Sequence, residues 1–309
     1  LYPILRGRGG ELVKRAAAIV ESARRRGGYT TVDLWRAVGI AAAGKWDSAT
    51  DEELEKAIRL AARALRYFAT FLPIVLNHIE SLLSEAWRRF VSWEAFEGGE
   101  SRQRLADQLS HIVYSAVGGR PPLLPHFFVP EKKELDPETV ANRFAALYNA
   151  ASNAGKLRLL NTLLYTVNWD IGGDNVTATL LGNPQLERRR AFKEVAKRVE
   201  ELVSQLDGVE RAYVVARLYP RLAKQYTSLG EFDKAVELVE ESLKALEELR
   251  SVYEKDKATT EEELWSYLEL RQVNPDLGRE LNELRRHVYY CAVFVYMGIG
   301  DLGNATKYA

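Results

Sequence analysis

The sequence predicts an all-α protein. Apolar residues recur at intervals of three and four along most of the chain, which is the period of an amphipathic helix. Glycine pairs and prolines divide these stretches into segments of helical length. Segments that alternate apolar and polar residues, as half-buried strands do, are rare, so we expect no substantial sheet.

Residues 1–117 are predicted to form an N-terminal helical region. Thr50 and Glu53 have the spacing of a capping box, in which each side chain bonds the other residue's backbone N–H. Pro73 interrupts a long apolar stripe, because proline lacks the N–H that a helix interior needs. The predicted helices are residues 11–26, 31–43, 51–71, 74–96 and 101–117.

Residues 118–136 are predicted to form a proline-rich connector. Prolines deny this stretch helical hydrogen bonds, so it should be extended. It also carries apolar residues such as Leu123, Phe127 and Phe128, which a solvated linker seldom has. These favour a connector packed on a helical face, and the alternative is an exposed peptide-like arm.

Residues 137–309 are predicted to form a second helical region. Asp136-Pro137 can serve as N-cap and first helical residue, and Thr259-Thr260 is expected to cap a short helix. The predicted helices are residues 137–153, 156–168, 184–206, 209–229, 231–256, 261–271 and 275–297.

Charge and composition exclude several classes of protein. The chain has 43 Lys and Arg residues and 43 Asp and Glu residues, and this balance argues against a dedicated nucleic-acid binder. A lone cysteine, Cys291, excludes an intrachain disulfide and a cysteine-rich zinc site. The longest apolar runs reach about half of the ~20 residues that a membrane helix needs, so we expect no membrane partner.

Further features point to origin and location. Arg outnumbers Lys, and Met and Cys occur once each, which suits a protein from a hot habitat. The chain begins at Leu1 without an initiator Met and shows no signal-peptide pattern. We therefore expect a fragment of a larger, cytoplasmic protein.

Two stretches of the second region share residues and spacing. Their tyrosines pack beside small residues, and a glycine then allows a tight turn into the next helix. The first copy has Tyr219, Leu222, Ala223, Tyr226, Gly230, Ala235 and Ser242, and the second has Tyr289, Ala292, Val293, Tyr296, Gly300 and Ala305. Both copies resemble the tetratricopeptide-repeat (TPR) family. The second copy ends early, at Ala309, and a weaker third copy spans Phe144 to Gly155.

This resemblance implies a stacked superhelix of antiparallel helical hairpins whose first helices line a concave surface. Residues expected on that surface are Arg217, Arg221, Lys224, His287, Tyr290 and Phe294. The resemblance also implies a scaffold or sensor role, in which the groove binds a protein, peptide or other ligand. Such arrays often form the sensing part of large signalling ATPases, and the chain looks similar to such a sensing part.

Each candidate set has a plainer interpretation. The cations could pair with nearby acids such as Glu237 or Glu240, and Tyr290 and Phe294 could be core residues. If the cations are open to a ligand instead, they could receive its carboxylates or phosphates.

A second candidate surface is a basic stripe formed by Arg188, Arg189, Arg190, Lys193 and Lys197. It could contact an RNA or DNA backbone, or it could be an ordinary solvated helix face. The four histidines have no metal-ligand spacing, and the chain shows no catalytic motif. We therefore expect a non-enzymatic protein without metal or cofactor, and keep a nucleic-acid-binding array as the alternative.

Overall fold

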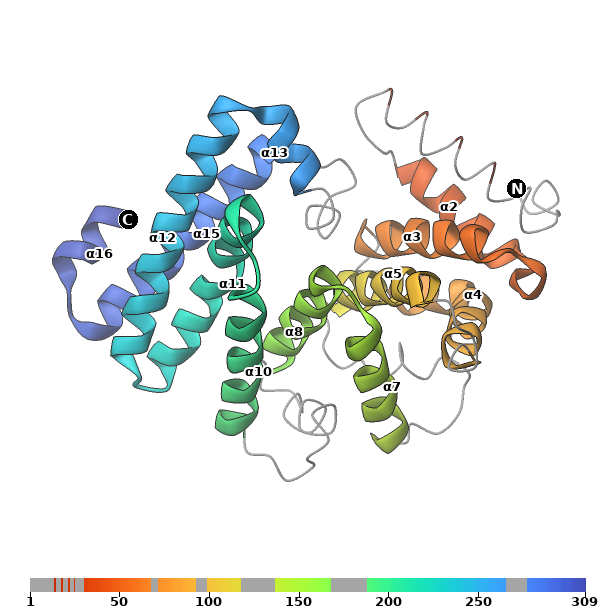
Figure 1. The fold of residues 1–309 in the computed structure, drawn as a ribbon, viewed down its shortest axis with the longest axis horizontal. Helices are drawn as coiled ribbons and strands as arrows, with labels where there is room; N and C mark the ends of the chain where they lie inside the picture. Colours follow the sequence, from red (N-terminus) through yellow and green to blue (C-terminus); the bar gives the residue numbers. More distant parts are fainter. Residues whose placement is uncertain are drawn as a thin grey trace. The chain divides into compact units, whose positions relative to one another are not determined.

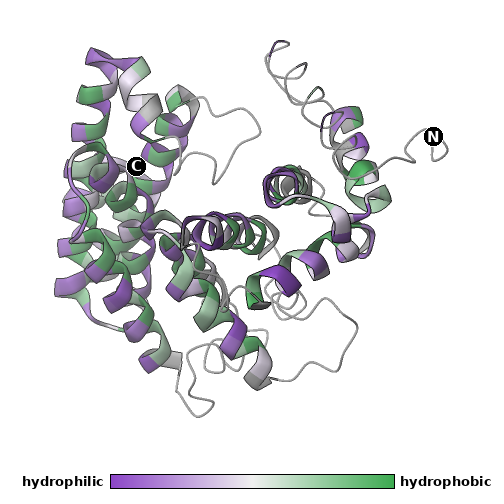
Figure 2. Ribbon diagram, turned by 45° about the vertical axis from the view of Figure 1, so that its right-hand side comes forward, coloured by the Kyte–Doolittle hydropathy of each residue, from purple (hydrophilic) through white to green (hydrophobic). Residues whose placement is uncertain are grey.

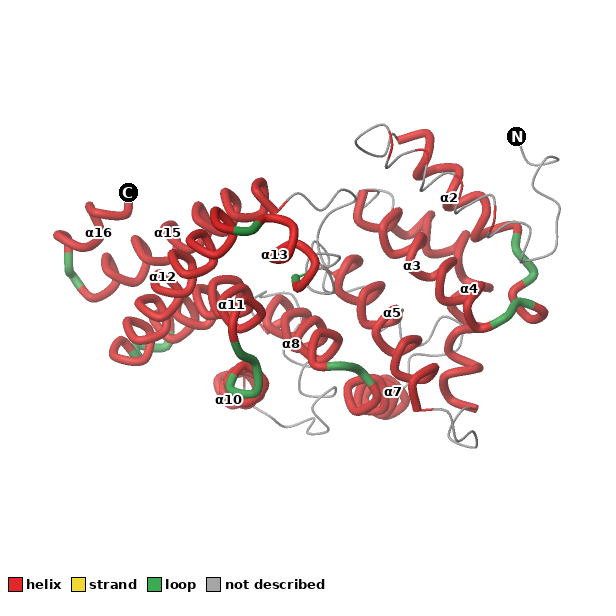
Figure 3. Tube along the Cα trace, turned by 45° about the horizontal axis from the view of Figure 1, so that its top comes forward, coloured by secondary structure: helices red, strands yellow, loops and turns green. Residues whose placement is uncertain are grey.

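The structure is a computed structural model of the 309-residue chain. The residues that it describes are Lys14, Ala18, Ser22, Arg25 and residues 31–67, 72–92, 99–117, 137–167, 188–264 and 277–309. In these residues all regular secondary structure is helical, which confirms the all-α prediction (Figures 1 and 3). The chain divides into two compact units, residues 1–191 and 192–309.

The first unit is built around the helix α5. The elements are α2 (Thr31–Ala43), the 3₁₀ turn η2 (Trp46–Ser48), α3 (Asp51–Tyr67), α4 (Leu72–Ser92), α5 (Gly99–Val117), α7 (Pro137–Ala150) and α8 (Asn153–Val167). Helix α5 contacts α3, α4, α7 and α8. Its buried residues include Leu105, Leu109 and Ile112, which recur at helical spacing and fill the centre of the unit.

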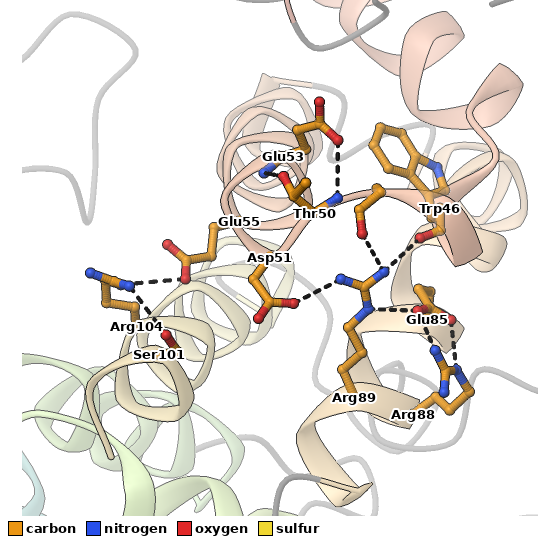
Figure 4. A network of polar contacts seen from close by, with 11 residues as sticks. Trp46, Thr50, Asp51, Glu53, Glu55, Glu85, Arg88, Arg89, Ser101 and Arg104 are labelled. Carbon is orange, nitrogen blue, oxygen red and sulfur yellow. Dashed lines mark hydrogen bonds and ion pairs between the residues drawn. The ribbon is translucent and has the colours of Figure 1, made fainter. Parts of the chain in front are cut away.

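The predicted capping box begins α3. The backbone N–H of Thr50 donates to Glu53 Oε2 at 3.0 Å, and the N–H of Glu53 donates to Thr50 Oγ1 at 3.3 Å (Figure 4). Two helix-terminal N–H groups that would otherwise lack partners are thereby satisfied. The helix starts at Asp51, as the sequence predicts.

Arg89 joins α4 to the loop that precedes α3. Its guanidinium donates to Asp51 Oδ1 at 2.8 Å and to the carbonyl oxygens of Trp46 and Ala49 at 3.0 and 2.6 Å (Figure 4). It also donates to Glu85 Oε1 at 2.6 Å. Burial opposes ionisation of Glu85, but hydrogen bonds from the neighbouring arginines outweigh it and hold the pKa of Glu85 below its usual value. One planar side chain thus satisfies groups on three elements.

The turn between α7 and α8 is fixed by Asp107 of α5. Asp107 Oδ1 accepts from the N–H and hydroxyl of Ser152, at 3.0 and 2.9 Å. The Ser152 hydroxyl in turn accepts from the N–H of Gly155 at 3.2 Å and caps α8. The turn therefore falls at Ala151 and Ser152, whereas the weak third repeat copy places it at Gly155, which lies inside α8.

The second unit is a set of amphipathic helices. They are α10 (Arg188–Val203), which crosses the boundary between the units, α11 (Gly208–Ser228), α12 (Phe232–Lys255), α13 (Lys257–Glu263), α15 (Leu277–Ile299) and α16 (Leu302–Tyr308). Helices α11 and α12 form the most extensively packed pair, and α15 packs against both. Hydrophobic and hydrophilic residues interleave along these helices, as amphipathic packing requires (Figure 2).

Two turns of the second unit have the same backbone geometry. Gly230 and Gly300 have φ of 76° and 82°, in the left-handed region that favours glycine. After each glycine, the next residue's N–H donates to a tyrosine carbonyl, Tyr226 or Tyr296, at 2.9 Å. The N–H of each glycine itself donates to a carbonyl in the last turn of the preceding helix, that of Thr227 or Met297. Both turns are Schellman caps, and each joins two helices.

Some predictions on element boundaries differ from the structure. Asp256, rather than Thr259-Thr260, caps the short helix α13, because Asp256 Oδ1 accepts from the N–H of Thr259 at 3.1 Å. The division into compact units falls after Ala191, and α7 and α8 contact α5 of the first unit. The connector at residues 118–136 lies outside the described residues.

Candidate functional site

Helix α11 carries the three cations that the sequence singled out. Arg217, Arg221 and Lys224 are four and three residues apart, so they lie on one side of the helix. Apolar residues such as Leu222 and Ala223 are buried on other sides and anchor α11 in the unit. We call Arg217, Arg221 and Lys224 the α11 cations. Helix α11 runs through Pro220 without interruption.

Helix α15 brings the aromatic candidates to the α11 cations. His287, Tyr290 and Phe294 are three and four residues apart and share one side of α15. Close packing near the ends of the two helices fixes this arrangement. A Cβ atom added to Gly298 would lie 2.6 Å from the side chain of Thr227, so α15 approaches α11 more closely than any larger residue at 298 would allow.

Lys224 lies against both aromatic rings. Its Nζ is 5.1 Å from the ring centroid of Tyr290 and 5.0 Å from that of Phe294. Both distances are within the range of a cation–π interaction. The rings thus hold the ammonium group in place while leaving it half-buried, and Tyr290 is 59% exposed.

Arg217 has a structural environment. Its Nη1 lies 3.2 Å from Glu280 Oε1, and both side chains are almost fully buried, with 5% and 2% exposure. The hydroxyl of Tyr213 donates to the same carboxylate oxygen at 3.0 Å. Removing one partner of such a buried pair leaves an uncompensated charge, so these contacts tie α11 to α15. For Arg217, the plainer interpretation, pairing with a nearby acid, is therefore the better one.

His287 is held neutral among the α11 cations. Burial lowers the pKa of His287 to about 3, and the positive charges of the α11 cations act in the same direction. Its Nε2 lies 4.0 Å from Cys291 Sγ. Burial also raises the pKa of the Cys291 thiol to about 11, although Lys224 and Arg221 oppose this. At neutral pH the imidazole is uncharged and the thiol is protonated.

The structure therefore brings together the residues that the sequence assigned to the concave surface. We call the surface formed by Arg221, Lys224, His287, Tyr290 and Phe294 the α11–α15 face. Arg217 lies beneath it with Glu280. Sequence reasoning missed Glu280, although its spacing of seven residues before His287 places it on the same side of α15 and could have indicated it.

The basic stripe on α10 is largely compensated by acids. The pairs are Lys193–Glu231 at 2.8 Å, Lys197–Glu201 at 3.8 Å and Arg198–Glu194 at 3.0 Å. Arg190 is exposed, and the side chains of Arg188 and Arg189 lie outside those the structure describes. These ion pairs lower the charge that α10 offers to phosphates, which favours an ordinary solvated face.

The described residues contain neither a candidate metal site nor a candidate membrane span. No group of three His, Cys, Asp or Glu side chains among them is placed to hold a metal ion. None of the helices described is long and apolar enough to cross a membrane.

Comparison of the chain with protein-family models, with curated proteins and with solved structures returned no match.

Proposed function

We propose that the second unit is a non-catalytic recognition module of the TPR type, whose α11–α15 face binds an acidic segment of a partner protein. The observation that carries this proposal is the position of Lys224 between Tyr290 and Phe294, next to Arg221. Such a surface offers cations for carboxylates and rings for apolar side chains.

The repeat assignment is supported by the two Schellman turns. The turns at Gly230 and Gly300 are 70 residues apart and share the same hydrogen bonds and the same sign of φ. Each follows a helix that carries tyrosine at matching positions, and α15 packs on the α11–α12 hairpin. Two hairpins built alike and packed together are what a helical repeat requires.

The state of the titratable groups favours binding over catalysis. A histidine with a pKa of about 3 is a poor proton acceptor at neutral pH, because an effective base has a pKa near the working pH. A buried thiol with a raised pKa forms little thiolate and is a weak nucleophile. The cations and rings of the face are thus better suited to holding a ligand than to transforming it.

Calorimetry with the full chain tests this proposal. We expect a peptide of about ten residues that mixes Glu with Leu to bind, and the double variant Arg221→Glu, Lys224→Glu to bind at least about tenfold more weakly, because two charge-assisted contacts become repulsive. Arg36→Glu, an exposed substitution on α2, is the matched control and should leave binding unchanged. Equal affinity of the double variant and the wild type would remove the α11–α15 face as the site.

A further inference from the structure

The outer side of α12 is acidic. Helix α12 packs into the second unit through residues such as Ala235, Leu238 and Leu249, which are buried. The opposite side is exposed and carries Asp233, Glu237, Glu240, Glu247 and Glu248, with Lys244 as its basic member. The buried residues of α12 lie on its other side, although Glu237 and Glu240, at the edge of the stripe, are close enough to act electrostatically on Tyr226 of α11 and Tyr296 of α15.

Apolar residues border this stripe. Val236 and Leu243 are half-buried and lie beside Glu240 and Glu247, since spacings of four, three and four residues keep one side of a helix. The outer side of α12 thus combines carboxylates with aliphatic side chains along one line. This is the chemistry that the proposed function requires of a partner.

The α11–α15 face has the complementary character. On the same side of α15, Arg286 is exposed four residues before Tyr290, and the acid Glu283 is exposed four residues before His287. Apolar area is also exposed there: Tyr290 is 59% and Met297 61% exposed. The second unit therefore presents a basic, aromatic surface on α11 and α15 and an acidic, aliphatic surface on α12.

We propose that the α11–α15 face binds α12 of a second copy of this chain, the acidic stripe of one copy lying on the cations of the next. This inference rests on the proposed function, because it names a partner for the same face. The free energy comes from charge complementarity and from covering Tyr290 and Met297 with Val236 and Leu243.

The geometry of this contact sets the kind of assembly. The two surfaces differ, so the interface is heterologous and leaves one unused surface of each kind on every pair. Association therefore continues beyond a dimer, into a ring or an open chain. An interface between two identical surfaces would stop at two copies.

The internal ion pairs of α12 do not block the contact. Glu237 lies 3.1 Å from Lys234, and Arg250 lies 3.5 Å from Glu247 and 3.9 Å from Glu254. The acids of these pairs are exposed and their basic partners half-buried, and ion pairs at the surface contribute only about 0.2–1 kcal/mol each. Exchanging them for contacts with a second copy therefore costs little.

Sedimentation velocity of the full chain over a range of concentrations tests the proposal. In about 50 mM salt the weight-average mass should rise through that of a dimer, and in about 500 mM salt it should return to that of the monomer, because salt screens the exposed charges. Arg221→Glu with Lys224→Glu, and separately Glu240→Lys with Glu247→Lys, should each weaken association at least about tenfold.

Exchanging the charges of the two surfaces is the decisive part of the experiment. The chain with all four substitutions, and a mixture of the two double variants, should both regain association because opposite charges face each other again. If a variant loses helical circular dichroism, the neutral substitutions Arg221→Gln and Glu240→Gln replace it, and each should halve the salt dependence of association. Association that survives both double variants overturns the proposal, as does failure of the exchange to restore it.

The result separates this inference from the proposed function. A wild-type chain that stays monomeric at every concentration in low salt, yet binds the Glu and Leu peptide through Arg221 and Lys224, overturns the self-association and leaves the proposed function standing. A monomeric chain that also ignores the peptide overturns both.

Discussion

At the scale of single residues, His287 illustrates how a polar side chain is fixed in one charge state. Burial and the α11 cations both disfavour the imidazolium, and they lower its pKa to about 3. The unfolded chain has neither influence, so there the pKa returns to about 6.5. Between these two values the unfolded state binds a proton that the folded state does not.

We predict that this difference makes the fold sensitive to acid. As pH falls from about 6.5 toward 3, His287 should reduce the free energy of unfolding by up to about 1.4 kcal/mol per pH unit. Urea unfolding of the wild type and of His287→Gln over this range measures the effect, and the variant should lose stability less steeply. An NMR titration of His287 near pH 6.5 in the folded protein would contradict the prediction.

Arg217 shows the limit of sequence reasoning at this scale. Its spacing with Arg221 and Lys224 correctly placed all three on one side of α11. Periodicity indicates on which side of a helix a residue lies, but it does not indicate how deeply the charged group of that residue is buried. The burial of Arg217 against Glu280 depends on α15, which is more than sixty residues away, and no local pattern encodes it.

At the scale of elements, the glycines of the two Schellman turns were identifiable because their requirement is local. A residue with φ near 80° is strained unless it is glycine, whatever the rest of the fold does. The caps of α8 and α13 were missed for a related reason. Ser152 and Asp256 cap those helices. By residue type, a threonine or asparagine that lies one to four residues later is an equally good N-cap. Tertiary contacts, such as the hydrogen bonds between Asp107 and Ser152, decide which residue is used.

We predict that Gly230→Ala and Gly300→Ala each destabilise the protein by about 1–2 kcal/mol. No atom lies within 4 Å of the added Cβ at either position, so the cost comes from backbone strain and not from a clash. Urea unfolding measures both variants. Gly303→Ala inside α16 is the matched control, where alanine should be neutral or slightly stabilising. A similar loss of stability in Gly303→Ala would argue against backbone strain as the cause.

At the scale of the whole molecule, the sequence predicted the helical content, whereas for the grouping of helices it offered only a change in composition. The proline-rich stretch suggested a boundary at residues 118–136, because composition changes there. In the structure, α7 and α8 belong to the first unit, where they contact α5, and the Asp107–Ser152 hydrogen bonds hold the turn between them. A domain is defined by which helices share a core, and this is a long-range property that composition does not report.

We predict that residues 188–309 fold on their own. They include the whole of α10 and the buried core of α11, α12 and α15, which contains Leu222, Val239 and Val288. Circular dichroism of this segment should show high helical content and a cooperative thermal transition. A segment that unfolds without cooperativity would show that the second unit depends on the first.

Cys291 gives the molecule a built-in reporter. It is the one cysteine of the sequence, and its side chain is 1% exposed between α15 and its neighbours. A thiol reagent can reach it only when α15 separates from the helices packed against it, so the rate of covalent labelling follows that opening. A ligand that clamps the two helices together would slow labelling without touching the sulfur atom, and the natural chain could therefore be screened for such ligands without an attached dye.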